Sequence, residues 1–177
     1  MIQSGGLEAV SLRRVATALG VTAPALYAYV SDKHDLLRGV AEGEFDRLMA
    51  AFDGIDDVDP IQRIRRLGRA YVEHAVADPE LFRTMFLFPP ELAISEITGQ
   101  ELPAATKAFE MALGATTDAV EQGIFPKVDA LTAALTTWTA MHGLADILLL
   151  GFVFDDKARE DLIETVIDTM IRGLQAR

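Results

Sequence analysis

Residues 11–33 read SLRRVATALGVTAPALYAYVSDK, and this stretch decides how the chain begins to fold. Ser11 is a favourable helix N-cap, and the apolar residues after it recur at the spacing of one helical stripe. Gly20 ends that helix, because glycine readily adopts a left-handed backbone, and Thr22 can cap a second short helix that runs to about Val30. Two short helices joined by a glycine-containing turn make a helix-turn-helix. Its small core is expected to contain Leu12, Val15, Ala16, Leu19, Val21, Leu26 and Val30.

The rest of the chain also has a helical pattern, because no long stretch alternates between apolar and polar residues. A third, long helix is expected to begin after Ser31 or Asp32. The acidic, turn-rich stretch 54–60 follows it and is the best candidate for a domain boundary. Further helices are expected at about 61–77, 79–87, 91–98, 102–122, 127–150 and 158–175. We therefore predict an all-α chain with a helix-turn-helix domain in residues 1–53 and a second helical domain in residues 54–177.

Charge is distributed unevenly along the chain. The 177 residues carry 16 Lys and Arg against 27 Asp and Glu, which gives a formal net charge of −11. Residues 1–40 hold four basic and three acidic residues, whereas residues 41–177 hold twelve basic and 24 acidic residues. Because an acidic surface repels phosphates, only the N-terminal part is a candidate for contact with nucleic acid.

Composition excludes several classes of protein. Half of the residues are apolar, which is enough for a core and excludes global disorder. The absence of Cys excludes disulfides, thiolate catalysis and thiolate metal sites. The sequence has neither a run of about 18 apolar residues nor a signal peptide. We therefore expect a cytoplasmic protein that does not enter the membrane.

The motifs of common enzymes are missing as well. The three His residues are scattered, and without Cys they form none of the usual pairs of nucleophile and base. A di-iron helical bundle needs Glu-x-x-His, and no Glu in this chain has a His three residues later. Neither a GxGxxG, a P-loop nor an HExxH motif is present. We expect no catalysis, cofactor or metal. A helical-bundle enzyme is therefore the least favoured hypothesis for the function of this chain.

Several short motifs occur together in residues 6–37. They are Gly6-Leu7, Ser11–Ala16, Leu19–Val21, Pro24–Val30, Ser31–Lys33 and Leu36-Leu37. Together they resemble the DNA-binding domain of the tetracycline-repressor (TetR) family of bacterial transcriptional regulators. The element Leu-Tyr-x-Tyr-x-x-x-Lys at 26–33, next to Leu-Gly-Val at 19–21, is more specific than helical periodicity alone. The resemblance implies a protein that binds operator DNA.

The resemblance also implies roles for individual residues. In the family, residues matching Ser11, Tyr27, Tyr29 and Lys33 hold phosphates, whereas those matching Arg13 and the first turn of the second helix face bases. The DNA-binding residues predicted in this way are Ser11, Arg13, Arg14, Thr22, Ala23, Pro24, Tyr27, Tyr29 and Lys33. Without the resemblance, the two arginines would be read as a solvated helix face and the two tyrosines as packing residues.

The chain departs from the family pattern at three points. Family members carry a helix ahead of Gly5-Gly6, and here only Met1-Ile2-Gln3 can correspond to its tail. We therefore expect that this first helix is either missing from the protein or lies ahead of Met1. Val30 stands where the family usually has Phe. Ala23 and Ala25 can contact only a thymine methyl group, because they carry no side-chain hydrogen-bonding group. Base recognition must therefore depend on Arg13, Thr22 and Arg14.

The C-terminal part is similar to one subgroup of the family, named for its Trp, His and Gly. The markers are Gly68–Val72, Asp78–Phe86, and Trp138 with His142-Gly143. This resemblance implies an all-helical domain that dimerises and binds a small effector.

The residues themselves also favour a homodimer. The expected helix at 158–175 has an apolar face that is wider than one contact needs, and the helix at 127–150 is apolar nearly all round. Such helices must be buried on most sides, so a pair from each subunit would form a four-helix interface. A large monomeric core is the alternative.

A cluster of aromatic and Met residues indicates a pocket for an effector. The predicted effector-binding residues are Tyr71, His74, Phe82, Met85, Phe86, Phe109, Leu113, Trp138, Met141 and His142. Few cationic residues fall among these positions, so a strongly anionic effector is disfavoured and a small apolar one is expected. The alternative is that these residues are plain core.

The sequence therefore favours a homodimeric repressor that binds a palindromic operator and is released by a small apolar effector. The second hypothesis is a helical ligand-binding or interaction protein that does not bind DNA.

Overall fold

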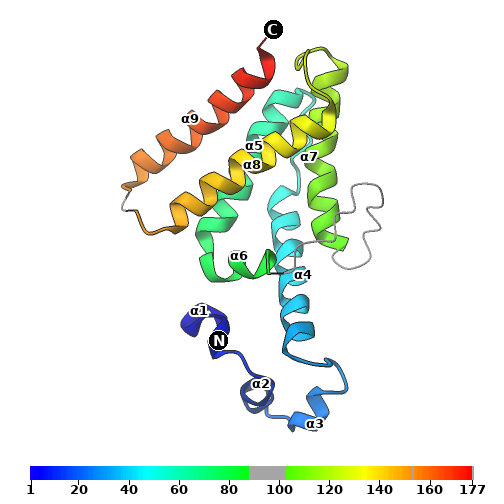
Figure 1. The fold of residues 1–177 in the computed structure, drawn as a ribbon, viewed down its shortest axis with the longest axis vertical. Coiled ribbons are helices and arrows are strands. Elements are labelled where there is room, and N and C mark those ends of the chain that lie inside the picture. Colours follow the sequence, from blue (N-terminus) through cyan, green and yellow to red (C-terminus); the bar gives the residue numbers. More distant parts are fainter. Residues whose placement is uncertain (88–102, 153, 177) are drawn as a thin grey trace.

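The computed structural model describes residues 1–87, 103–152 and 154–176, and these residues form only helices and connecting loops (Figure 1). In chain order the helices are α1 (Ile2–Gly5), the 3₁₀ helix η1 (Leu7–Ala9), α2 (Leu12–Leu19), α3 (Ala23–Leu26), α4 (Lys33–Phe52), α5 (Pro60–Ala77), α6 (Pro79–Met85), α7 (Pro103–Glu121), α8 (Ala130–Leu149) and α9 (Asp156–Gln175). The all-α prediction is confirmed, and the helix expected at 91–98 lies outside the described residues.

The predicted caps define the helix-turn-helix. Ser11 accepts a hydrogen bond from the backbone N–H of Arg14 at 3.3 Å, and Thr22 accepts one from Ala25 at 3.3 Å. Gly20 ends α2 with a φ of 69°, in the left-handed region that favours glycine. Of the two candidates for the cap of α4, Asp32 fills the position, because its carboxylate accepts the N–H of Asp35 at 2.8 Å.

Helix α3 is shorter than the sequence predicts, because it ends at Leu26 instead of about Val30. The N–H groups of Ala28 and Tyr29 donate to carbonyls three residues back, at 3.4 and 3.0 Å, so the backbone tightens into turns there. One helical turn covers little surface. Consequently Leu19 and Val21, which were expected in the small core, are 63% and 45% exposed.

A separate small cluster joins the N-terminal segment to the rest of the chain. Ile2, Val10 and Leu37 are buried together, and Leu81 of α6 packs against them. The side chain of Gln3 also donates a hydrogen bond to Asp78, at the start of α6. The N-terminal helices are therefore attached through α6 as well as through the continuous helix α4 (Figure 1).

The main core lies among helices α4 to α9. Helix α9 packs against α5 and α8, and the residues that α9 buries within its own chain are Ile163, Ile167, Met170, Ile171 and Leu174. The sequence predicts that the apolar face of this helix is too wide to be covered within one chain. That prediction is wrong for most of the residues on this face. The same chain already covers them, and the outward residues of α9 include Thr165, Thr169 and Gly173.

Arginine side chains of α5 form ion pairs with acidic residues of α9 and α7. Arg69 donates to Glu160 at 2.5 Å and also to Glu164, while Arg65 donates to Asp168. The hydrogen bond from Arg65 holds the pKa of Asp168 below its usual value. These contacts pair arginines of α5 with acidic residues of the helix beside it. None of the described helices has the length and apolar character needed to cross a bilayer.

The inner face of α9 provides a test of this packing. Ile167 is 1% exposed, so Ile167→Ala leaves a cavity and should lower the free energy of unfolding by about 2–5 kcal/mol. Lys157→Ala on the same helix removes only a surface ion pair with Asp161 and should cost about 1 kcal/mol or less. Denaturant unfolding at one fixed protein concentration measures both, and equal losses would contradict the packing.

Candidate nucleic-acid interface and internal cavity

The helix-turn-helix lies at the end of the molecule farthest from the C-terminus (Figure 1). On its surface Arg13 and Arg14 are exposed, and Tyr27 and Tyr29 are 56% and 86% exposed. Two tyrosines so exposed contribute little to the chain's own core. Their rings and hydroxyl groups are instead available to an external partner.

Some of the predicted DNA-binding residues have a structural contact in the free chain. The guanidinium of Arg14 donates to the carbonyl of Ala9 at 2.8 Å, and the ammonium of Lys33 donates to the carbonyl of Leu7 at 2.9 Å. Both contacts brace the segment around η1 against the helix-turn-helix. Among the described residues, the side chain of Arg13 forms no such contact, so all its donors can be used on a ligand.

The hydroxyl groups of Ser11 and Thr22 act as helix caps, in which the oxygen accepts a backbone N–H. A hydroxyl that accepts one hydrogen bond still has its own proton to donate. Both residues can therefore cap a helix and contact a phosphate or a base at the same time. Ala23 is half-buried and Pro24 is exposed in the first turn of α3.

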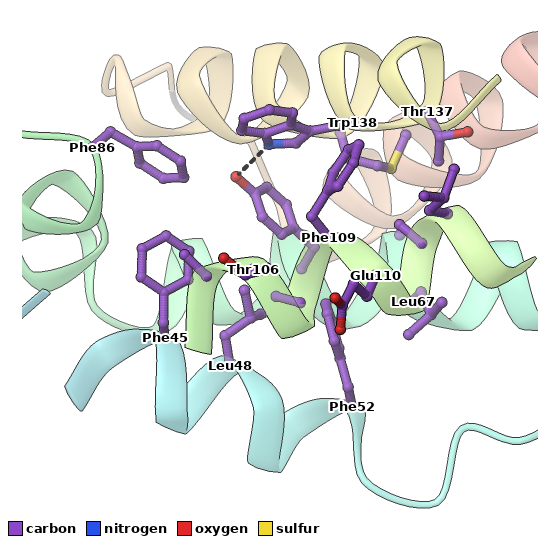
Figure 2. A pocket seen from close by; sticks show the side chains of 17 residues that line it. Phe45, Leu48, Phe52, Leu67, Phe86, Thr106, Phe109, Glu110, Thr137 and Trp138 are labelled. Carbon is purple, nitrogen blue, oxygen red and sulfur yellow. Dashed lines mark hydrogen bonds between the residues drawn. The ribbon is translucent and has the colours of Figure 1, made fainter. Parts of the chain in front are cut away.

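A cavity of about 260 Å³ lies between α4, α5, α7 and α8 (Figure 2). The lining residues are Phe45, Leu48, Phe52, Leu67, Gly68, Tyr71, Phe86, Ala105, Thr106, Ala108, Phe109, Glu110, Ala112, Leu113, Thr137, Trp138 and Met141. Figure 2 shows Trp138 above, Phe45, Leu48 and Phe52 below, and α7 crossing between them with Thr106, Phe109 and Glu110. At Gly68 an added Cβ would lie 2.9 Å from the sulfur of Met141, so the absence of a side chain lets α5 approach α8.

Six of the ten predicted effector-binding residues line this cavity: Tyr71, Phe86, Phe109, Leu113, Trp138 and Met141. The other four do not line it. Phe82 and Met85 are buried in the core, His74 faces α4, and His142 lies behind Tyr71.

Sequence reasoning missed the part of the lining that α4 provides. Phe45, Leu48 and Phe52 follow one another at helical spacing, which does indicate a buried face. That spacing carries no information about which helices the face meets. The three residues were assigned to the DNA-binding half of the chain and were therefore not considered as candidates for a pocket.

A hydrogen-bonded group of three rings forms one wall of the cavity. The hydroxyl of Tyr71 lies 2.8 Å from Nδ1 of His142, and Nε1 of Trp138 donates to the same hydroxyl at 3.4 Å. Nε2 of His142 lies 3.7 Å from the carboxylate of Asp146. Burial raises the pKa of Tyr71, so its phenol stays protonated at physiological pH.

Two carboxylates in the middle of α4 reach the C-terminal helices. Glu42 accepts the backbone N–H of Ala104, at the start of α7, at 2.9 Å. Glu44 is 3% exposed, and its Oε1 lies 3.0 Å from Nε2 of His74 on α5, without hydrogen-bond geometry; its Oε2 accepts from Arg47 at 3.0 Å. Burial lowers the pKa of His74, although the nearby Glu44 acts in the opposite direction. His74 is therefore neutral at pH 7.

Two family models match the chain. The model described as "Tetracyclin repressor-like, C-terminal domain" matches residues 64–170, and the model described as "Bacterial regulatory proteins, tetR family" matches residues 1–40. No curated protein matches the sequence.

Solved structures with the same fold include a Rhodococcus protein of unknown function, with 27% identity and a TM-score of 0.81 over 99% of this chain and 90% of that one. A putative TetR-family regulator from Vibrio parahaemolyticus has 25% identity and a TM-score of 0.65 over 94% and 90% of the two chains. The TetR-family regulator PfmR from Thermus thermophilus has 23% identity and a TM-score of 0.66 over 99% and 94%.

The buried His74 predicts a pH dependence of stability. Its pKa is lowered in the folded chain from an ordinary value of 6.5, so below pH 6.5 the unfolded chain binds the proton more readily. The stability that the folded chain gains by keeping His74 neutral is therefore fully present above pH 6.5. It is lost as the pH falls toward the pKa of His74 in the folded chain. His74→Gln should therefore reduce the loss of melting temperature between pH 7 and pH 5. The same slope in wild type and His74→Gln would contradict the assignment.

Proposed function

Because the chain belongs to the tetracycline-repressor family of DNA-binding transcriptional regulators, we propose that it is a repressor that binds a palindromic operator as a homodimer. We propose further that a small apolar molecule in the cavity releases it from the operator. This is a binding function without catalysis. The Trp-His-Gly subgroup remains a prediction, because the matching models do not address it.

The observation that carries this proposal is the course of helix α4. Its first turn contains Lys33, next to the helix-turn-helix, and its last turns supply Phe45, Leu48 and Phe52 to the cavity. A ligand that changes the packing of these three side chains would move α4 or strain it. Such a shift of α4 also moves the helix-turn-helix. The ligand then changes DNA binding to the extent that its affinity differs between the DNA-bound and the released arrangement of the protein.

For the DNA contact we propose that α3 enters the major groove. In that orientation Arg13 and Thr22 would reach base edges, and Ala23 and Pro24 would contact apolar groups. Tyr27, Tyr29, Ser11, Lys33 and Arg14 would hold the backbone phosphates. The exposure of Tyr27, Tyr29 and Arg13 supports this assignment.

For the dimer we propose an interface made of the outward faces of α8 and α9, close to the ranges 127–150 and 158–175. The outward residues of the two helices include a series of small ones, alongside larger ones such as Ile147 on α8 and Arg172 on α9. The small residues are Thr132, Thr136, Thr139 and Gly143 on α8, and Thr165, Thr169 and Gly173 on α9. The hydroxyls of Thr136 and Thr165 donate to carbonyls of their own helices, at 2.8 and 2.6 Å, so they present methyl groups outward. Small apolar surfaces let helices approach closely, which supports a four-helix interface.

The direct test of the proposed function is a gel shift of the protein against its own promoter region and against a library of random duplexes. A palindromic sequence should be selected, with half-site centres about 34–36 Å apart or a multiple of that. A chain that binds no duplex under any salt condition would favour the second hypothesis, a ligand-binding protein without DNA binding.

The base-reading and phosphate-holding roles can be separated by mutation. Arg13→Ala should relax the preference at one base-pair position and cost about 1–3 kcal/mol on the selected operator. Lys33→Ala should weaken binding to all duplexes and reduce the salt slope by about 1. Lys33 also donates a hydrogen bond to the carbonyl of Leu7, so the melting temperature of the Lys33→Ala variant is measured in parallel. Tyr29→Phe tests a second predicted phosphate contact and leaves the Lys33–Leu7 hydrogen bond in place. A uniform loss across duplexes for Arg13→Ala would contradict its assigned role.

A glycine on the proposed interface gives a sharp test of dimerisation. A Cβ added at Gly143 meets no atom within 4 Å, so the folded chain itself tolerates a side chain there. Gly143→Arg should therefore produce a folded monomer with much weaker operator binding. Gly114→Arg is the matched control, because Gly114 is exposed on α7 with the same free space, and it should stay dimeric. Sedimentation velocity distinguishes the two, and a dimeric Gly143→Arg protein would place the interface elsewhere.

A further inference from the structure

We propose that the cavity selects a lipophilic amine, protonated at neutral pH, in preference to a carboxylic acid with the same hydrocarbon skeleton. The inference rests on the proposed function of the cavity as the effector site. It deepens that function by naming the chemical class of the ligand.

The lining has no group that can neutralise an anion. None of the described residues that line the cavity is Lys or Arg. The arginines of α5 are directed to acidic residues of other elements, as Arg63 is to Asp118 and Arg65 to Asp168. A carboxylate in the cavity would lose its hydration without gaining a charged partner.

The lining does contain a carboxylate of its own. Glu110, which is exposed on α7, lines the cavity from its solvent side, beside Thr106 and Phe109 (Figure 2). Within residues 1–87, 103–152 and 154–176 it forms no salt bridge, in contrast to Glu160 and Glu164, which pair with arginine. A cation in the cavity would supply the partner that Glu110 lacks, and an anion would be repelled by it.

Aromatic faces supply a second attraction for a cation. Phe45 and Phe86 meet edge to face with ring centroids 6.0 Å apart, and Phe109 and Trp138 lie with centroids 6.0 Å apart. All four line the cavity from different elements. The faces of aromatic rings carry partial negative charge and attract ammonium groups, with Trp the strongest.

The Tyr71 hydroxyl has only an acceptor position left for a ligand. An indole N–H is always a donor, so Trp138 occupies one lone pair of the Tyr71 oxygen. We assign the imidazole proton of His142 to Nε2, the nitrogen that lies 3.7 Å from the Asp146 carboxylate. In that tautomer Nδ1 accepts the Tyr71 proton. The remaining lone pair can accept a hydrogen bond from an amine N–H, but it repels a carboxylate oxygen.

The size of the cavity sets the size of the probe. A volume of about 260 Å³ corresponds to roughly nine liquid-water volumes of about 30 Å³ each, so it suits a ligand of about ten non-hydrogen atoms. 4-Phenylbutylamine, 4-phenylbutanol and 4-phenylbutanoate meet this requirement. They share one skeleton and differ only in a cationic, neutral or anionic end group.

Trp138 is the only tryptophan and lines the cavity, so its fluorescence reports binding of each probe. The amine should bind at least about tenfold more tightly than the carboxylate, with the alcohol between them. The amine should also release the selected operator at the lowest concentration. A carboxylate that binds as tightly as the alcohol overturns the proposal.

Glu110→Gln tests the charge directly while keeping the shape of the side chain. This variant should lose several-fold affinity for the amine and much less for the alcohol. Glu121→Gln, on the same helix but outside the lining, should bind all three probes as wild type does. Equal affinity of Glu110→Gln and wild type for the amine would also overturn the proposal.

The outcomes separate this inference from the function on which it rests. If all three probes bind and release the operator but the acid binds best, the cavity is an effector site and only the proposed selectivity fails. If none of them changes the Trp138 signal or operator binding, the effector role of the cavity fails together with the selectivity. The DNA-binding function is judged independently, by the gel shift without ligand.

Discussion

Helix α4 is the element on which the rest of the structure depends, because it belongs to two clusters of buried residues at once. Near its start Leu37 packs with Ile2 and Val10, and farther along Phe45 and Leu48 enter the main core. Its 20 residues span about 30 Å as one continuous rod. A regular helix cannot change its packing at one end without displacing or bending the other, so the two clusters are mechanically linked.

The connection does not rest on apolar packing alone. Glu42 accepts a hydrogen bond from the start of α7, and the buried Glu44 lies against the half-buried His74 of α5. Each contact ties the middle of α4 to a different helix around the cavity. A buried carboxylate beside a neutral imidazole is sensitive to its distance from that partner, because the interior weakens screening. Small movements of α4 therefore have an energetic cost at this point, between the cavity and the helix-turn-helix.

Charged side chains are also distributed unevenly between the surface and the cavity. The arginines of α5 are directed outward, where they hold α9 and α7 through acidic residues, and none of them lines the cavity. The cavity is left with aromatic walls, the hydroxyl of Tyr71 and the carboxylate of Glu110. The exposed Arg13, by contrast, lies in the part of the chain that has no acidic excess. One chain with a net charge of −11 can thus carry both the proposed surface for phosphates and a cavity that we propose disfavours anions.

The sequence by itself determined the all-α class, the helix-turn-helix and most helix ends. These features are local: Ser11, Thr22 and Asp32 each bond to a backbone N–H three residues away, whatever the rest of the chain does. The division at residue 53 is still a prediction, because no finding tests it, and the second half of α4 packs in the main core.

The packing of the helices against one another determines which apolar faces are buried within the chain and which line the cavity. It buried Ile167 and Met170 of α9 within the chain, although their spacing fitted an intermolecular contact equally well. It also brought Phe45 and Phe52 of α4 to the cavity and left His74 outside its lining. The reason is physical: the period of a helix shows which side chains must leave water, but the helix that covers them is chosen by packing between segments far apart in sequence.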